Sequence, residues 1–488
     1  MNKKYIIAAA FLILGAVNQS CSNDFIDVSP TEAIPESALG EIYNNNEGAN
    51  SLLTAAYAKF LDWNMSTFAW IGVTSIVSDD ADKGSSPSDS GSDKDILDAL
   101  NFTASTPSFK ELFASNYQGI NRCNQALKYL PQLDKADADL RKRLAGEAKF
   151  LRAFMYFTLV KSFGGVPLVD HVPVSGVEAD KIMTLTRKSK EEIYAFIEQD
   201  LKDAIEVLPN KSAYTASDAG RASVGAAHAL LAKVYLYQKK WQLAVDQCNL
   251  VTGYSLTPNF IDIYKVSGEN NAESIFEING SGGTAGRAIQ QYSQVQGARG
   301  TTGWGWGFAT PTQSLYDAYS ATDTRRDATI IHKDMTLYDG YYVGPNVENK
   351  FYNYKAYSSN YRDQASTDVN IRYLRYAEVL LMKAEAMNEL GQTSAAIPFL
   401  NEVRNRANVA NTTAVSQADV RTAVWKERRL ELAFEHDRWF DLVRTGQAQA
   451  AMAADGGKVF KVGTHELFPL PQDFITETGG LSAQNPGY

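Results

Sequence analysis

Two tryptophans in a glycine-rich run are the side chains of this sequence best suited to non-covalent chemistry. The segment "TTGWGWGFATPT" (residues 301–312) contains Trp304 and Trp306, and Tyr292 precedes it in the same irregular stretch. Such rings offer an apolar face and a polar edge, which suits half-wet surfaces. Tryptophan gains by burial, whereas glycine and Pro311 mark surface turns. We expect Trp306 to be packed inside and Trp304, with Tyr292 nearby, to contact a ligand.

A second irregular stretch, residues 64–95, and the tryptophan just before it supply further candidates. Trp63, Trp70, Asp79 and Asp80 could form an opposite wall of the same site. Both tryptophans adjoin helical patterns, so a core role is about as plausible as a binding role. The acidic run "DDADKGSSPSDSGSD" invites a calcium site, but it lacks the alternating ligands and the glycine and glutamate of an EF-hand. We therefore favour a solvated acidic loop.

Acid–base chemistry is conceivable in "KERRLELAFEHDRWFDLVRTG" (residues 426–446). Glu435, His436 and Arg438 are the groups that could carry it. If the run is one helix, Glu435 and Arg438 lie three residues apart on one face and form an ion pair. We favour a structural mesh of ion pairs that ties this helix to its neighbours. A glycosidase needs two facing carboxylates, and 56 acidic residues leave that alternative open.

Cofactor and metal motifs are weak or missing in the sequence. "GSGGTAG" (residues 280–286) follows a predicted strand, but it lacks the βαβ context of a dinucleotide fingerprint, so we expect a flexible loop. No HExxH, nucleophile elbow or phosphate loop occurs. Cys123 and Cys248 have no metal-ligand spacing and are expected in the core, with a disulfide between them left open. The sequence predicts no cofactor and no metal.

Charge and the N-terminus restrict partner and location. The 47 basic and 56 acidic residues give a net charge of −9, which disfavours nucleic acid. The start, "MNKKYIIAAAFLILGAVNQSCSN", has two lysines and an apolar run too short to span a bilayer, as in a signal peptide. It resembles a bacterial lipoprotein signal with Cys21 as the acylated residue; a plain signal with an incidental cysteine is the alternative. Residues 1–20 would be the signal and 21–40 a tether.

Helical periodicity dominates the rest of the chain. Three stretches keep apolar residues on one helical face or are apolar on most sides: residues 48–62, 117–131 and 144–169, the last ended by Gly164 and Gly165. Residues 229–251 and 378–407 each predict a helical hairpin of the tetratricopeptide kind, in which small residues let the helices approach closely.

The second hairpin carries an apolar stripe at helical spacing, formed by Ile371, Leu374, Ala377, Leu381 and Ala384. Between the hairpins lies a turn-rich, tyrosine-rich insertion with one clear strand, "ESIFEING". The predicted fold is mainly α, a tetratricopeptide-like helical-hairpin scaffold with large loop and short-strand insertions. We expect a single domain over residues 41–488: scaffold in 41–255 and 371–446, a ligand-binding insertion in 256–370, and an extension in 447–488.

Three stretches resemble the SusD/RagB family of surface lipoproteins. They are "FLRAFMYFTLVKSFGGVPLV", then "LRYAEVLLMKAEAMNELGQTSAAIPFLNEVRNRA" with residues 426–446, and the terminal "LFPLPQDFITETGGLSAQNPGY". The resemblance covers nearly the whole chain, in the family's order. It implies a lipid-anchored protein at the outer-membrane surface that binds oligosaccharide or polysaccharide without catalysis. The implied partner is a SusC-like TonB-dependent transporter, over whose barrel the protein acts as a lid.

The resemblance assigns a role to the aromatic residues. A sugar ring has an apolar C–H face and a hydroxyl rim, so its site needs aromatic platforms with amide, carboxylate or guanidinium partners. One indole covering roughly 60 Å² contributes about 1.5 kcal/mol, which gives micromolar to millimolar affinity for two or three platforms. The alternative is a surface helical-repeat protein that binds peptide or protein cargo for the same kind of transporter.

Overall fold

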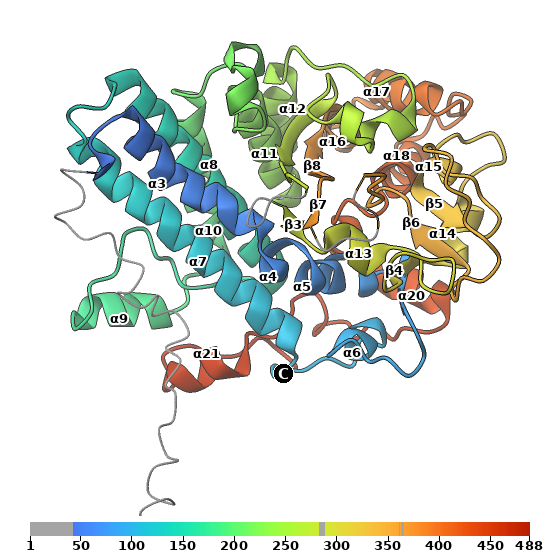
Figure 1. Cartoon of the computed structure of the whole chain (residues 1–488), viewed down its shortest axis with the longest axis horizontal. Coiled ribbons are helices and arrows are strands. Elements are labelled where there is room, and N and C mark those ends of the chain that lie inside the picture. Colours follow the sequence, from blue (N-terminus) through green and yellow to red (C-terminus); the bar gives the residue numbers. More distant parts are fainter. Residues whose placement is uncertain (1–41, 283–287, 361, 363–365) are drawn as a thin grey trace, which may run out of the picture.

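The computed structural model describes residues 42–282, 288–360, 362 and 366–488, and helices make up most of its regular structure (Figure 1). The predicted mainly α fold is confirmed. Cys21 and the expected signal and tether lie outside the described residues, as does most of "GSGGTAG". Within the described ranges, no helix is long and apolar enough to cross a membrane.

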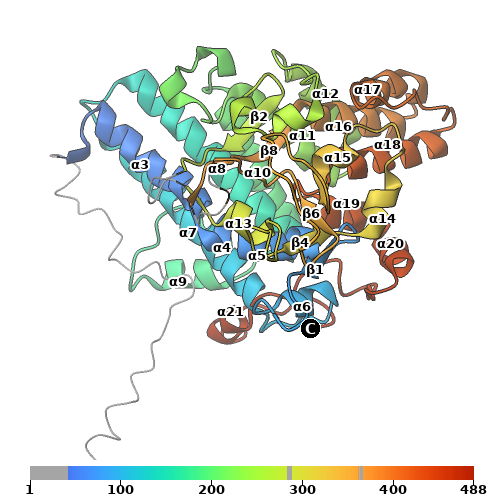
Figure 2. The same ribbon diagram turned by 45° about the vertical axis from the view of Figure 1, so that its right-hand side comes forward.

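Nine longer helices form a continuous array in which each packs on the next (Figures 1 and 2). They are α3 (Asn46–Ala58), α7 (Pro107–Tyr129), α8 (Ala138–Phe163), α10 (Lys190–Ile205), α11 (Val224–Tyr237), α12 (Trp241–Leu250), α16 (Tyr376–Glu389), α17 (Thr393–Arg406) and α18 (Gln417–Leu432).

Local signals fix the ends of these helices. Ser189 and Glu192 form a capping box at the start of α10, with hydrogen bonds of 2.8 and 3.2 Å between side chain and backbone. α8 ends at Phe163 because Gly164 follows with φ 73°, a left-handed conformation that favours glycine. The expected glycine stop of this helix is confirmed.

Both predicted hairpins are present, as α11–α12 and α16–α17. Ala244 and Ala396 are fully buried, so the second helix of each pair approaches its neighbours closely. α12 also packs against α16, which brings the two hairpins together although an insertion separates them in sequence. The predicted apolar stripe, however, is only partly helical. Ile371 and Leu374 lie in a strand that pairs with the strand of "ESIFEING", and the helix begins after them.

In the part of the chain that the structure describes, the short strands form two-stranded pairs, and each of these pairs is antiparallel. β1 (Ala81–Gly84) pairs with β4 (Phe308–Pro311), β2 (Ser274–Ile278) with β8 (Ile371–Arg375), β3 (Ile289–Gln290) with β7 (Ser366–Thr367), and β5 (Ile330–His332) with β6 (Phe351–Asn353). The predicted strand in "ESIFEING" is β2. The β1–β4 pair is important for the site because it joins the early irregular stretch to the glycine-rich segment.

Short helices complete the described chain. In the early stretch they are η3 (Lys59–Leu61), α4 (Trp63–Ser66), α5 (Phe68–Ile71), the π-helix η4 (Gly72–Ile76) and α6 (Lys94–Asp98). The others are η5 (Leu130–Gln132), α9 (Glu178–Leu185), η6 (Lys211–Ala213), η7 (Ala216–Asp218), η8 (Phe260–Ile263), η9 (Val266–Gly268), α13 (Tyr292–Gln296), α14 (Gln313–Ala318), α15 (Arg326–Thr329), α19 (Arg438–Thr445), α20 (Ala448–Asp455) and α21 (Gln472–Glu477).

Candidate ligand-binding surface

The glycine-rich segment folds back on the end of α13 as a tight loop. The backbone N–H of Trp304 donates to the Ala298 carbonyl at 2.7 Å, and that of Trp306 donates to the Gln294 carbonyl at 2.8 Å. A side chain at Gly303 or Gly305 would overlap these same carbonyl groups. The glycines therefore let the loop pack closely against the preceding backbone, and the tryptophans that alternate with them supply two large rings.

Trp304 is buried in this loop, with 6% of its surface exposed. Its ring makes edge-to-face contacts with Tyr341 and Tyr357, at centroid distances of 5.4 and 5.3 Å. These rings belong to a small core of the insertion that is separate from the main helical core. The exposure expected of Trp304 is wrong: the loop folds over a local tyrosine cluster, which receives this indole.

Trp306 is the more exposed of the two indoles. It is half-buried and packs against the half-buried Trp63 at a centroid distance of 5.9 Å and an interplanar angle of 60°. Trp63 in turn lies against Phe68, with centroids 5.1 Å apart. The two irregular stretches thus meet, as expected, but they meet through Trp63 and Trp306. We call this half-exposed cluster of Trp63, Phe68 and Trp306 the aromatic surface.

Amide side chains border the aromatic surface. The carbonyl oxygen of the Gln290 side chain accepts from the backbone N–H of Trp63 at 3.0 Å, and Gln291 donates to the Gln294 side chain at 3.1 Å. Gln290 is exposed, while Gln291 and Gln294 are half-buried. These glutamines were missed in the sequence, although "IQQYSQVQ" beside an aromatic run is the signal that could have found them. Rings and amides together can stack on a flat ligand and exchange hydrogen bonds with its rim.

Tyr292 and Trp70 are interior residues instead, with 4% and 3% exposure. The Tyr292 hydroxyl lies 3.2 Å from Nε2 of His436, and the Trp70 ring packs 5.4 Å from the same imidazole. Burial raises the pKa of Tyr292 to about 12 and lowers the pKa of His436 to about 3. The structure therefore places neither Tyr292 nor Trp70 on the surface that Trp63 and Trp306 share.

Asp79 and Asp80 are also buried, and both pair with arginine side chains. Asp79 accepts two hydrogen bonds from Arg438, both of 2.7 Å, and Asp80 accepts one of 2.6 Å from Arg429. Burial opposes ionisation of Asp79, but its bonds and charge contact with Arg438 lower its pKa. The solvated acidic loop expected here is wrong at these positions, because two arginines from the C-terminal half draw both carboxylates into the interior.

The charged segment 426–446 is not one continuous helix. α18 ends at Leu432 and α19 begins at Arg438, and Phe434 and His436 between them have φ of 62° and 74°. Glu435 consequently does not pair with Arg438. It pairs with Arg375 and with Lys355, at 2.6 Å each.

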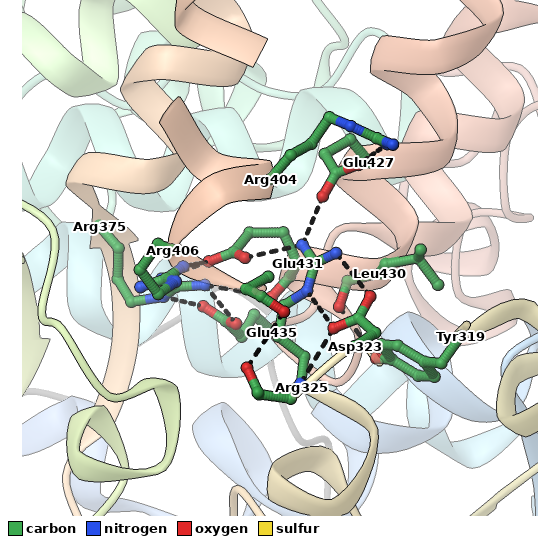
Figure 3. A network of polar contacts seen from close by, with 12 residues as sticks. Tyr319, Asp323, Arg325, Arg375, Arg404, Arg406, Glu427, Leu430, Glu431 and Glu435 are labelled. Carbon is green, nitrogen blue, oxygen red and sulfur yellow. Dashed lines mark hydrogen bonds and ion pairs between the residues drawn. The ribbon is translucent and has the colours of Figure 1, made fainter. Parts of the chain in front are cut away.

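Figure 3 shows the mesh that these charges form. Arg375 bonds Glu431 at 3.0 Å, and Arg325 bonds Glu427 at 2.6 Å and Asp323 at 2.8 Å. All of these side chains are essentially buried. The expected structural mesh is present, with other partners than the sequence suggested, and it links α18 to strand β8 and to the insertion.

The mesh leaves Glu435 poorly suited to proton transfer. Burial opposes its ionisation, but the charges of Arg375 and Lys355 outweigh this and hold its pKa at about 2. A general acid needs a pKa near the working pH. Its two carboxylate oxygens are, moreover, already occupied by hydrogen bonds from Arg375 and Lys355.

Cysteine and metal chemistry has little support in the described part of the chain. Cys123 and Cys248 are buried free thiols, as expected of core residues, and burial raises the pKa of each to about 12. Among the described residues, no group of three or more His, Cys, Asp or Glu side chains is placed to hold a metal ion.

Comparison with known proteins identifies the family. The model of the SusD family matches residues 340–488, and a model described as starch-binding associating with outer membrane matches residues 24–236. A solved structure titled laminarin binding SusD-like protein is 30% identical, with a TM-score of 0.77, and the match covers 91% of this chain and 100% of that one. This chain belongs to the SusD/RagB family.

Two further relatives agree with this assignment. SusD-like protein P2 of Formosa agariphila is 29% identical over 410 residues, which cover 76% of this chain and 79% of the relative. The structure of surface glycan-binding protein A from Bacteroides fluxus is 27% identical, with a TM-score of 0.77, covering 91% of this chain and 99% of that one.

Proposed function

We propose that the protein is a cell-surface lipoprotein that binds glycan, captures oligosaccharide and delivers it to a SusC-like TonB-dependent transporter, for which it acts as a lid. Two relatives whose titles name laminarin binding and glycan binding support the class of ligand. Cys21 would carry the lipid anchor, and binding would occur without cleavage of the ligand.

The proposal rests mainly on the aromatic surface. Trp63 and Trp306 present two half-exposed indoles at an angle of 60°, so successive sugar rings of a bent chain can each cover one. The exposed Gln290 amide can donate to and accept from ring hydroxyls beside them. None of these groups changes charge near neutral pH. The surface therefore suits a neutral ligand that is held by stacking and amide hydrogen bonds.

Titration calorimetry with laminarin tests the proposal. We expect micromolar to millimolar affinity for the parent protein and about tenfold weaker binding for Trp306→Ala, because one stacked ring is worth about 1.5 kcal/mol. Trp63→Ala should act similarly. Val415→Ala is the matched control, since Val415 is 81% exposed and remote in sequence from both stretches.

Three results would count against the proposal. The first is unchanged affinity in the folded Trp63→Ala/Trp306→Ala variant. The second is binding of peptides from a casein digest in place of any glycan on an array, which is the outcome for the peptide-cargo alternative. The third is release of reducing ends from the bound polysaccharide, which would make the protein an enzyme.

For the partner, we expect a TonB-dependent barrel to co-purify from outer membranes with the protein.

A further inference from the structure

A cleft lies between the two helical hairpins, away from the aromatic surface. It has a volume of about 350 Å³ and is lined by residues that include Tyr237, Trp241, Trp425 and Arg421. Tyr237 and Trp241 flank the α11–α12 turn, and Trp425 comes from α18. All three rings are half-buried. None of these elements contributes to the aromatic surface, so this inter-hairpin cleft is a separate site.

The Glu and Arg charges of the cleft are paired within the protein, while Lys239, which also lines it, is exposed. Arg444 donates to both carboxylate oxygens of Glu385, at 2.6 and 2.9 Å, and Arg421 does the same to Glu389, at 2.6 and 2.7 Å. A ligand carboxylate would have to compete with these bidentate pairs for a guanidinium group. The pairs still offer fixed donor and acceptor edges. This favours a neutral ligand with many hydroxyl groups over a peptide terminus.

Two donors in the cleft wall lack partners. The Tyr237 hydroxyl and the indole N–H of Trp425 are shielded from solvent and form no hydrogen bond with the described residues. An unpaired buried donor costs about 1–3 kcal/mol. That cost is already present before any ligand binds. A ligand oxygen that reaches either donor through a small side-chain movement therefore gains a hydrogen bond without a new desolvation penalty.

The cleft continues into a neighbouring one of about 520 Å³, which Tyr237 and Lys239 also line. There Glu198 pairs with Lys240 at 2.5 Å, and the lining also holds Lys190, Glu191 and Lys239, which leaves a small positive excess. Two adjoining clefts on either side of the α11–α12 turn suit an extended ligand of several units. A ring against Trp425 or Trp241 would lie at one end of it.

We propose that the inter-hairpin cleft is a second saccharide-binding site, which takes a neutral oligosaccharide. The rings of Trp241 and Trp425 stack on sugar faces, and the Glu385–Arg444 and Glu389–Arg421 pairs bond hydroxyl groups. The site is independent of the aromatic surface, and either one can bind ligand when the other is disabled.

Calorimetry on the full-length protein separates the two sites. The probes are laminarihexaose, maltohexaose and cellohexaose. In the Trp63→Ala/Trp306→Ala background, we expect one of these to bind with one site per chain. Adding Trp425→Ala should weaken that binding at least about tenfold. Trp425→Phe, which keeps a ring and loses the N–H, should have an intermediate effect.

Lys426→Ala is the matched control, because Lys426 is the exposed neighbour of Trp425 on α18. It should leave binding unchanged. The proposal is overturned if the folded Trp63→Ala/Trp306→Ala protein binds none of the probes, if Trp425→Ala binds as well as its background, or if only casein peptides bind there. An unchanged affinity of Trp306→Ala for laminarin, with one-site binding kept in the Trp63→Ala/Trp306→Ala protein, would count against the aromatic surface alone.

Discussion

The aromatic surface and the buried ion-pair mesh are built from different kinds of side chain. The mesh concentrates Glu, Asp, Arg and Lys, side chains that often take part in catalysis, yet these groups are buried and paired with one another. The aromatic surface consists of uncharged rings and amides, and its half-buried rings come from the short helices α4 and α5 and from the glycine-rich loop. In the proposed account, ionic chemistry holds the scaffold together, while contact with ligand falls to uncharged side chains on a loop and two short helices.

The largest effect is expected from breaking the mesh. Arg375→Met removes one cationic partner from Glu273, Glu431 and Glu435, so the buried carboxylates outnumber the charges that compensate them. We expect a loss of about 3–5 kcal/mol in the free energy of unfolding, measured by chemical denaturation. Arg326→Ala breaks an exposed pair with Asp327 and should cost less than about 1 kcal/mol. Equal losses in the two variants would contradict the structural role of the mesh.

The next largest effect is expected from acid, which should lower the stability of the protein without changing its affinity for glycan. The pKa of His436 is about 3 in the folded protein and ordinarily 6.5, so the unfolded chain binds a proton that the folded one does not. Stability is then present above pH 6.5 and falls as the pH drops, by about 2 kcal/mol between pH 8 and pH 5 for this group. His465, with a pKa lowered to about 4 by burial, acts in the same direction.

Below pH 4.5 the mesh adds to this loss of stability. The pKa of Glu435 is about 2 in the folded protein and ordinarily 4.5, so the unfolded chain binds a proton there that the folded protein does not. Glycan affinity should stay constant between pH 5 and pH 8, since the aromatic surface has no titrating group. Thermal unfolding and calorimetry over one pH series measure both. A His436→Gln protein with the same pH slope as the parent would refute the assignment.

Trp304 and Trp306 lie in one loop but should contribute differently, Trp304 to stability and Trp306 to binding. Trp304→Phe leaves space in the tyrosine cluster and should cost about 1–2 kcal/mol of stability with little change in affinity. Trp306→Ala should do the reverse. Melting curves and laminarin titrations on both variants decide the matter, and a larger affinity loss for Trp304→Phe would reverse the roles.

The smallest effect is expected from the loop backbone. A methyl group at Gly305 would overlap the Gln294 carbonyl and Gly297, so Gly305→Ala must shift the loop and with it Trp306. We expect affinity to fall about threefold, the smallest change in binding, with a loss of about 1–3 kcal/mol in the free energy of unfolding. Gly340→Ala is a useful comparison, because Gly340 has positive φ but open space around it. An unchanged affinity in Gly305→Ala would show that the position of Trp306 does not depend on this close return.

Long-range pairing explains where sequence reasoning succeeded and failed. Helices such as α8 are encoded by local periodicity and a glycine stop, so they could be predicted. The partners of Asp79 and Glu435 could not, because Arg438 and Arg375 reach them only through the fold. Residues two apart in an extended chain share a face, so spacing offered no basis for separating Trp304 from Trp306. Their environments differ because the glycines turn the loop over the tyrosine cluster.

A crystal structure with bound oligosaccharide tests the central claim most directly. We predict sugar rings in van der Waals contact with the indoles of Trp63 and Trp306, with Gln290 bonded to a hydroxyl group and the glycosidic bonds intact. A structure in which neither indole contacts the ligand, or in which the ligand has been cleaved, would contradict the account.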